Sequence, residues 1–307
     1  LTLIMIASVG LWLAGERLVW RASQNWLTWG AHGPRPFWPW IERILVLPML
    51  FISAMGILSL VLLAIWSIAR RWRFPDILPS KWSFSRWTSH ADAIIDTFST
   101  TLVLGLIATA IGMALTLLSL ENEARHGKRL GRYTDGLKYL PLLVPQTSFL
   151  FGVQILAIWS GLSVLGWVGD WSLVIWGHLL FVLPYCFIGF SLSFQQLDQR
   201  MLASARSLGA GPWRIFWQFK RPLLRVCLAV TVDIARSVSV AQYLPTLVLS
   251  GGRITTLTTE TVSLSSGSDR RLLAVYALSQ AVLPFACLMA AITIPRLAFI
   301  NRRGMQP

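Results

Sequence analysis

Long apolar blocks, each of about twenty residues or more, constrain this chain more than any other feature of its sequence. A helix of about twenty apolar residues crosses the hydrocarbon core of a bilayer. The composition agrees, because 55% of the residues are hydrophobic and only 13% are charged, a charged share well below that of soluble domains. The mean hydropathy is +0.60. The sequence therefore predicts an all-α, polytopic membrane helix bundle, since a helix satisfies its own backbone groups in lipid.

Six apolar blocks predict six membrane spans in the region 41–307. Their bounds are Ile41–Ala69, Ile94–Leu120, Lys138–Ser160, Trp171–Phe194, Leu223–Leu244 and Leu272–Ile294. The shorter apolar run at 1–14 predicts the end of a helix that begins upstream. The polar, proline-containing stretch at 15–40 is interpreted as a cytoplasmic linker. We therefore expect one six-helix half, preceded by the tail of another half in a longer chain.

Basic residues are unevenly divided between alternate loops. The linker, residues 121–138, residues 195–225 and the C-terminal tail hold more than twice as many Lys and Arg as the other loops. Cytoplasmic loops of membrane proteins carry this excess, so these four segments are expected in the cytoplasm. The same bias explains the net charge of +14 without nucleic acid. One loop of the opposite set, 70–93, is an exception with five basic residues.

The loop Leu197–Leu224 predicts two short helices joined by a hinge. Gly209 and Gly211 allow a sharp turn, and Pro212 suits the first turn of a helix. The residues that follow at helical spacing form an aromatic stripe beside a basic edge; they are Trp213, Phe216, Trp217 and Lys220. On the first helix, helical spacing predicts a shared face for Leu202, Ala205 and Leu208. Such a knob suits docking into another protein, and the alternative is an amphipathic loop lying on lipid headgroups.

This loop resembles the EAA loop of binding-protein-dependent ABC permeases. The triplet is Ala203-Ser204-Ala205, the glycine is Gly209, and the closing element is Phe219–Pro222. Two positions depart from the family pattern, because Ala203 replaces the acidic residue and Arg221 replaces the closing leucine. The resemblance implies an EAA-type coupling loop at 195–222. Within it, the resemblance implies an ATPase-coupling role for Ala203, Ser204, Ala205, Gly209, Pro212, Trp213, Phe216, Lys220 and Pro222.

The resemblance extends over about 82–296, and is strongest to fused, two-half permeases of the thiamine and ferric-iron types. In YLPLLVPQTSFLFG, Pro141 and Pro145 match a proline-broken third helix. Membership would imply an inner-membrane permease subunit of an ABC importer. Its partners would be an ABC ATPase dimer carrying ATP and Mg, a periplasmic substrate-binding protein and a second permease half. A small polar solute is the implied substrate, with a thiamine-like cation first, although Gln242 stands where those permeases usually have an acidic residue.

Polar residues inside the apolar blocks are candidates for a substrate pathway, because burying them in lipid is costly. They are Gln146, Ser148, Asp233, Arg236 and Gln242. Asp233 and Arg236 lie three residues apart and can pair on one helix face. They either line the pathway or form a structural ion pair. His178 is interpreted as a packing residue. The run Thr255–Glu260 predicts a short interfacial helix on the periplasmic side, where a binding protein could dock, and the alternative is a solvated loop.

Motifs of several enzyme classes are absent from the sequence. It has no GxxxxGK[ST] phosphate loop and no HExxH or CxxC spacing. We therefore expect no ATP hydrolysis, no metal and no cofactor in this chain. Two other functions remain open from the residues: a secondary transporter or channel that uses Asp233 and Arg236 without an ATPase, and a membrane anchor whose loop binds another partner.

Overall fold

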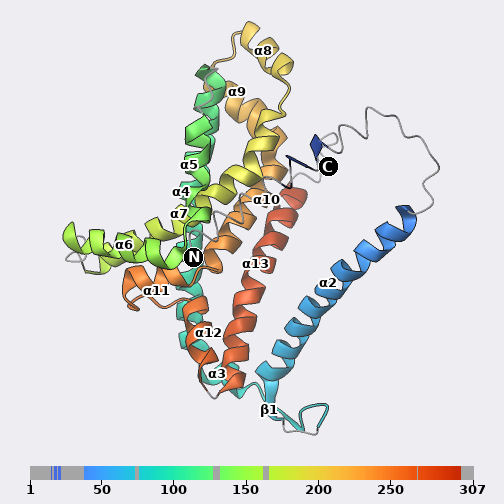
Figure 1. Ribbon diagram of the computed structural model, residues 1–307, viewed down its shortest axis with the longest axis vertical. Helices are drawn as coiled ribbons and strands as arrows, with labels where there is room; N and C mark the ends of the chain where they lie inside the picture. Colours follow the sequence, from blue (N-terminus) through green and yellow to red (C-terminus); the bar gives the residue numbers. More distant parts are fainter. Residues whose placement is uncertain are drawn as a thin grey trace.

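The computed structural model describes residues 38–72, 76–126, 132–161, 166–267 and 269–298, with a few isolated positions between 15 and 21. The expected helix end at 1–14 and most of the linker at 15–40 lie outside these residues. The regular elements of the described part are helices, except for one pair of short strands (Figure 1).

Five of the described helices are long and seven are shorter. The long helices are α2 (Trp38–Ile68), α4 (Ala91–His126), α7 (Trp167–Gln195), α10 (Arg221–Val240) and α13 (Arg270–Ala298). The shorter ones are α3 (Ser85–Ser89), α5 (Arg132–Leu143), α6 (Gln146–Trp159), α8 (Gln199–Ser207), α9 (Pro212–Ile215), α11 (Leu244–Ser250) and α12 (Leu257–Ser265). A π-helical turn, η2 (Phe216–Lys220), joins α9 to α10.

Four described helices are long and apolar enough to cross a membrane, and a fifth span is possible if one bent pair counts as one. The four segments are Val46–Ile68, Ala91–Arg125, Trp167–Gln195 and Arg270–Met289. They match four of the six predicted blocks. The all-α membrane architecture is therefore confirmed, while two of the six expected spans differ from simple apolar helices.

The third predicted span is bent rather than straight. Gly136–Leu143 and Gln146–Trp159 meet at 104°, and Pro145 lies at the break with φ −56° and ψ 121°. Proline lacks the N–H that a continuing helix needs and disfavours helical geometry in the residue before it. The prediction of a proline-broken helix is confirmed.

The fifth predicted span, Leu223–Leu244, corresponds to α10, which carries too many charged residues to count among the candidate membrane spans. Its charged residues include Arg225, Asp233 and Arg236. Asp233 and Arg236 are buried, because α10 packs against α4, α7 and α13. Shielding by these neighbours, rather than apolar composition, explains how α10 can lie within the bundle.

The centre of the bundle is the packing of α7 against α4 and α10. Val182, Cys186 and Phe190 of α7 are completely buried there. Small residues let the helices approach closely, as is usual in membranes. A Cβ atom on Gly189 would lie only 2.9 Å from the hydroxyl oxygen of Thr231 on α10.

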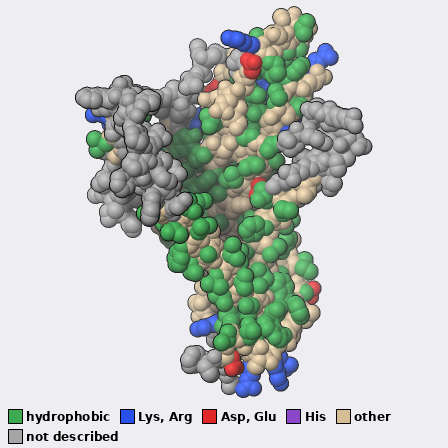
Figure 2. Space-filling view, turned by 90° about the vertical axis from the view of Figure 1, so that its right-hand side faces the viewer, with side chains coloured by type: hydrophobic (Ala, Val, Ile, Leu, Met, Phe, Trp, Pro, Cys, Tyr) green, Lys and Arg blue, Asp and Glu red, His purple; other side chains and the backbone are tan. Residues whose placement is uncertain are grey.

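The molecule is elongated, with α8 and α9 at one end and α3, α12 and the strands at the other (Figure 1). On the face shown in Figure 2, apolar side chains cover the middle, and Lys and Arg side chains gather toward the two ends. This distribution matches a bilayer around the middle of the bundle.

A two-stranded antiparallel sheet, which the sequence did not predict, follows α2. Strand β1 (Ala69–Arg71) pairs with β2 (Lys81–Trp82). The amide of Ser83 also donates to the carbonyl of Ile68 at 2.8 Å, and the amide of Ser80 to that of Arg71 at 3.0 Å. These bonds fold the loop between α2 and α3 back against the end of α2.

Candidate functional site

The first helix of the candidate coupling loop is bounded by a polar cap and a left-handed glycine. The carboxylate of Asp198 accepts a hydrogen bond from the amide of Arg200 at 2.8 Å and starts α8. Gly209 ends it with φ +80°, a conformation that costs a residue with a Cβ about 1–2 kcal/mol. Pro212 then opens α9 after Gly211, which has an extended conformation. The predicted pair of helices with a glycine hinge is confirmed.

The two helices enclose a small core of their own. Leu202 and Ala205 of α8 pack against Ile215 of α9, and Phe219 lies at the edge of this cluster. We call residues 198–220 the hairpin. Leu208 was expected on the same face, but its exposed fraction is 87%. The expectation fails because the helix ends at Ser207, so the chain has already turned away at Leu208.

The triplet of the EAA-like pattern lies mostly on the outer face of α8. Ala203 and Ser204 are exposed, whereas Ala205 is buried in the hairpin core. The Ser204 hydroxyl is occupied by its own helix, since it donates to the carbonyl of Arg200 at 3.0 Å. Pro222, half-buried, lies in the first turn of α10. Ala203 and Ser204 are thus available to a partner, and Ala205 and Pro222 shape the backbone.

An aromatic ridge projects from the second half of the hairpin. Trp213 and Trp217 are 66% and 51% exposed, and both meet the ring of Phe216 edge to face, with centroids 6.4 and 5.6 Å apart. The guanidinium of Arg221 lies over the Trp217 ring at 4.8 Å. We call these four residues the ridge. They present a large, preorganised aromatic surface, the kind that dominates protein interfaces.

The spacing of Lys220 from Trp213 predicts a place on an exposed basic edge, and this prediction is wrong. Lys220 is buried, with 2% exposed, and its ammonium group lies 2.5 Å from Glu121 Oε2 of α4. The same group lies over the ring of Phe194 of α7 at 4.9 Å. The π-turn is the physical reason, because a π-helix has more residues per turn than an α-helix and changes the direction of each side chain after Phe216. Lys220 thereby connects the hairpin to two long helices.

Glu121 is a functional candidate that the sequence reasoning missed. It also binds Arg125 Nε at 2.9 Å, and its neighbour Glu123 binds Lys138 of α5 at 3.1 Å. The only sequence signal was its position directly after an apolar block. A largely buried carboxylate needs a cationic partner. Lys220 provides it, although it lies 99 residues away in the sequence.

Within the bundle, a polar network is centred on His178 of α7. Its two ring nitrogens each lie 2.8 Å from a hydroxyl, Ser239 Oγ of α10 and Thr246 Oγ1 of α11. Gln242 Nε2 reaches the carbonyl of His178 at 3.5 Å, and the buried Gln242 Oε1 has no partner among the described residues. The interpretation of His178 as a packing residue therefore needs extending, because it joins three helices through hydrogen bonds.

The pathway candidates divide into two groups. Asp233 and Arg236 form the predicted pair, with Nη2 and Oδ1 2.5 Å apart, and Arg236 also donates to the carbonyl of Pro284 at 3.3 Å. They are buried within this bundle together with Gln242, whereas Gln146 and Ser148 are exposed at the start of α6. A pathway role for either group stays a prediction.

The expected short helix near Thr255–Glu260 is confirmed as α12. Thr256 caps it by accepting from the amide of Thr259 at 3.3 Å, and the amide of Thr256 donates to Thr259 Oγ1 at 2.7 Å. The helix packs against α13 and α4. Just before it, Arg253 forms a two-point ion pair with Asp170 of α7, and this hydrogen-bonded carboxylate raises the pKa of Arg253.

Comparisons with known proteins agree with this architecture. No family model matches the chain. The inner membrane ABC transporter permease protein YnjC of Escherichia coli (strain K12) is 32% identical over 258 residues, which is 84% of this chain and 44% of YnjC. The chain thus spans less than half the length of this relative. The predicted relationship to ABC permeases is confirmed at this level.

Two solved structures share the fold. A bacterial ABC transporter involved in the import of the acidic polysaccharide alginate matches with a TM-score of 0.56 and 17% identity, over 85% of this chain and 98% of that chain. The fold is that of an ABC transporter permease. The alginate transporter in complex with a periplasmic protein bound to alginate pentasaccharide gives a TM-score of 0.57 and 16% identity, over 88% and 100%. The similarity to the inner membrane protein YnjC and the several apolar helices together place the chain in the inner membrane as a multi-pass protein.

Proposed function

We propose that this chain forms one transmembrane half of an ABC importer and that a separate ATPase binds its hairpin. The observation that carries the proposal is the combination of an exposed aromatic ridge with a buried tie to the bundle. Trp213 and Trp217 offer the contact surface, and Lys220 fixes that surface to α4 through Glu121. Large exposed aromatics on a self-packed knob favour docking to a protein. The similarity to YnjC supports the same function.

In this mechanism the hairpin moves as a rigid body. Its own core and the cap at Asp198 hold α8 and α9 together. Closure of an ATPase dimer around ATP and Mg would displace the ridge, and the Lys220–Glu121 pair would pull α4 with it. Phe194 transmits the same displacement to α7. The two helices at the centre of the bundle therefore respond together, which is what alternating access requires.

Each end of the molecule is proposed to bind a different partner. The ATPase dimer binds at the hairpin, and a periplasmic substrate-binding protein approaches the end that holds α12. The complex of the alginate transporter with a periplasmic protein supports the second contact. A second permease half completes the pathway, and the greater length of YnjC is consistent with two halves in one chain.

The proposed substrate is a small polar solute, with a thiamine-like cation as the first candidate. This choice rests on the resemblance of the sequence to thiamine-type permeases. Gln146 and Ser148 are exposed on this half and can face a pathway shared with a second half. Asp233 and Arg236 neutralise each other inside the bundle, so they would contact a solute only after the helices separate.

Photo-crosslinking tests the docking. A photoreactive phenylalanine analogue replaces Trp213 in the full-length protein in native membranes, and adducts are identified by mass spectrometry. The matched control is the same replacement at Trp82, which is 51% exposed and lies on β2, the partner of strand β1 at the opposite end of the molecule (Figure 1). An ATPase subunit captured only from Trp213 supports the proposal. Capture of lipid alone from both positions, together with uptake that needs no ATP, overturns it in favour of a secondary transporter.

A further inference from the structure

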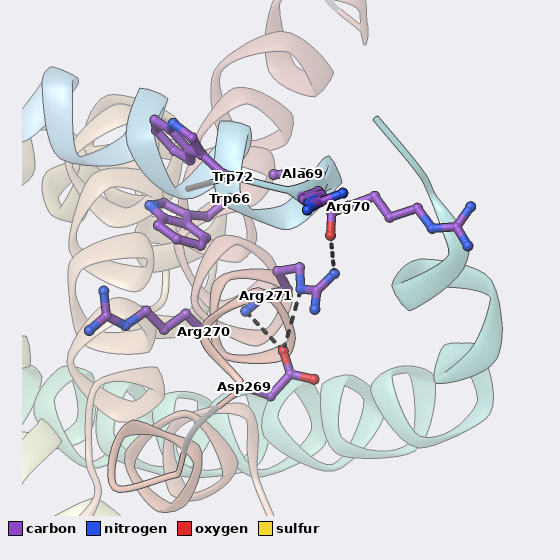
Figure 3. A pocket seen from close by; sticks show the side chains of 8 residues that line it. Trp66, Ala69, Arg70, Trp72, Asp269, Arg270 and Arg271 are labelled. Atoms are coloured by element: carbon purple, nitrogen blue, oxygen red, sulfur yellow. Dashed lines mark hydrogen bonds and ion pairs between the residues drawn. The ribbon is translucent and has the colours of Figure 1, made fainter. Parts of the chain in front are cut away.

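A second candidate site lies at the end of the molecule opposite the hairpin. A cavity of about 420 Å³ opens between the end of α2, strand β1 and the start of α13. Four of its lining residues are arginines and two are tryptophans, with one carboxylate, Asp269 (Figure 3). None of the functions proposed above uses this cavity.

The walls of the cavity are held by contacts that leave most of its charge unused. Arg271 Nη1 donates to the carbonyl of Arg70 at 2.5 Å and thereby joins α13 to β1 (Figure 3). Asp269 binds Arg86 at 2.7 Å. The indole N–H of Trp72 donates to the carbonyl of Asp76 at 2.9 Å. These contacts fix the shape of the cavity before any ligand arrives.

The remaining arginines have no carboxylate partner in the described part of the chain. Arg70, Arg71 and Arg270 are exposed and line the cavity, and the single lining carboxylate is already bound by Arg86. The cavity is therefore strongly cationic. A planar guanidinium group can donate two parallel hydrogen bonds to phosphate oxygens, with a defined geometry. The chemistry of the lining thus fits a phosphate group.

The surroundings of the cavity place it at the boundary of the bilayer. An 18-residue apolar window within Val46–Ile68 of α2 has no buried residue, so this helix offers its side chains to lipid. Trp66 and Trp72 lie at its end with ring centroids 4.8 Å apart, and tryptophan prefers the headgroup depth. A ligand with a phosphate in the cavity and hydrocarbon along α2 would match both features.

We propose that this cavity binds the phosphate of a membrane phospholipid headgroup, with the acyl chains lying along α2. The site also gives a role to Arg70 and Arg71, two of the five basic residues of the loop 70–93, which lies on the side where the Lys and Arg bias predicts few. This proposal needs only a membrane around α2 and does not depend on the transport function.

Native mass spectrometry of the purified full-length protein tests the site. The protein is released from vesicles of phosphatidylglycerol and phosphatidylcholine, and the retained phosphatidylglycerol is counted. R270Q and the double variant R70Q/R71Q are compared with wild type. The matched control is K81Q, which removes one exposed charge at the same end from a residue that does not line the cavity. Arg271 and Asp269 are left intact because they hold the walls.

The expected loss is about fivefold in phosphatidylglycerol affinity for each arginine removed, with no change in K81Q. Diacylglycerol, which lacks the phosphate, should not be retained. Equal losses in R270Q and K81Q would show unspecific surface attraction and overturn the site. Displacement of the lipid by millimolar inorganic phosphate would assign the cavity to a soluble phosphate and overturn the lipid.

Discussion

The ammonium group of Lys220 lies 2.5 Å from the carboxylate of Glu121, although 99 residues separate them in the chain. When this ion pair is broken, Glu121 keeps another charged partner and Lys220 does not. Glu121 also binds Arg125, whereas Lys220 has only the ring of Phe194 as a second partner in the described structure. The side chain of Lys220 is 3% exposed and that of Glu121 is 14% exposed.

E121Q should therefore destabilise the protein more than K220M. Removing the carboxylate strands a buried ammonium group, which costs about 3 kcal/mol. Removing the ammonium leaves Glu121 paired with Arg125 and should cost about 1 kcal/mol. Unfolding of the purified protein in mixed micelles measures both. A larger loss in K220M would show that Glu121 depends on Lys220 more than its pair with Arg125 indicates.

Gly209→Leu should uncouple ATP hydrolysis from uptake while the protein remains in the membrane. A leucine at φ +80° costs about 1–2 kcal/mol, which is enough to change the turn between α8 and α9. The control is Gly211→Ala, because Gly211 has φ −67° and open space around a new Cβ. ATPase activity and uptake in proteoliposomes are measured together. Normal uptake in Gly209→Leu would contradict the role of the hinge.

Trp213→Ala and Trp217→Ala should each weaken ATPase binding about tenfold or more, as expected for aromatic interface residues. Both side chains are exposed, so the stability of the isolated protein should change by less than about 0.5 kcal/mol. Trp82→Ala is the control for loss of an exposed indole at the other end. Binding of the purified ATPase gives the readout. Unchanged binding in both variants would remove the ridge from the interface.

Gly189→Ala should destabilise the bundle by about 1–3 kcal/mol through overpacking. The new Cβ would lie 2.9 Å from Thr231 Oγ1 and 3.0 Å from Thr231 Cγ2. Thr231→Ala removes both atoms, so the double variant should recover part of the loss. Gly152→Ala on α6 has nothing within 4 Å and should be neutral or slightly stabilising. Additive losses in the double variant would show that Thr231 is not the obstacle.

The membrane architecture was predictable because hydropathy is a local property of the sequence. The broken third span was predictable from Pro145, and the hinge of the hairpin from Gly209, for the same reason. The burial of α10 was harder to predict from the sequence, since its charged residues are tolerated only because α4, α7 and α13 surround it. A hydropathy profile contains no information about such neighbours.

The contacts of Lys220 could not be predicted from its spacing. The helical period assigned it to the outer face, and the π-turn at 216–220 moved it inward. Its partner Glu121 lies on another helix, and the hydroxyls that bind His178 come from α10 and α11. Pairings of this kind depend on tertiary packing and leave no pattern in a single sequence.

The exposed window of α2 has a consequence for how the chain enters its membrane. Because the window contributes no buried residue to the bundle, its apolar side chains can be stable in lipid by themselves, and the helix can insert before the rest of the bundle packs. Its contacts with α13 form in a later step. We therefore expect the hydropathy of this segment to decide whether it inserts into the membrane. A packing defect elsewhere in the bundle would then leave the chain inserted but unassembled.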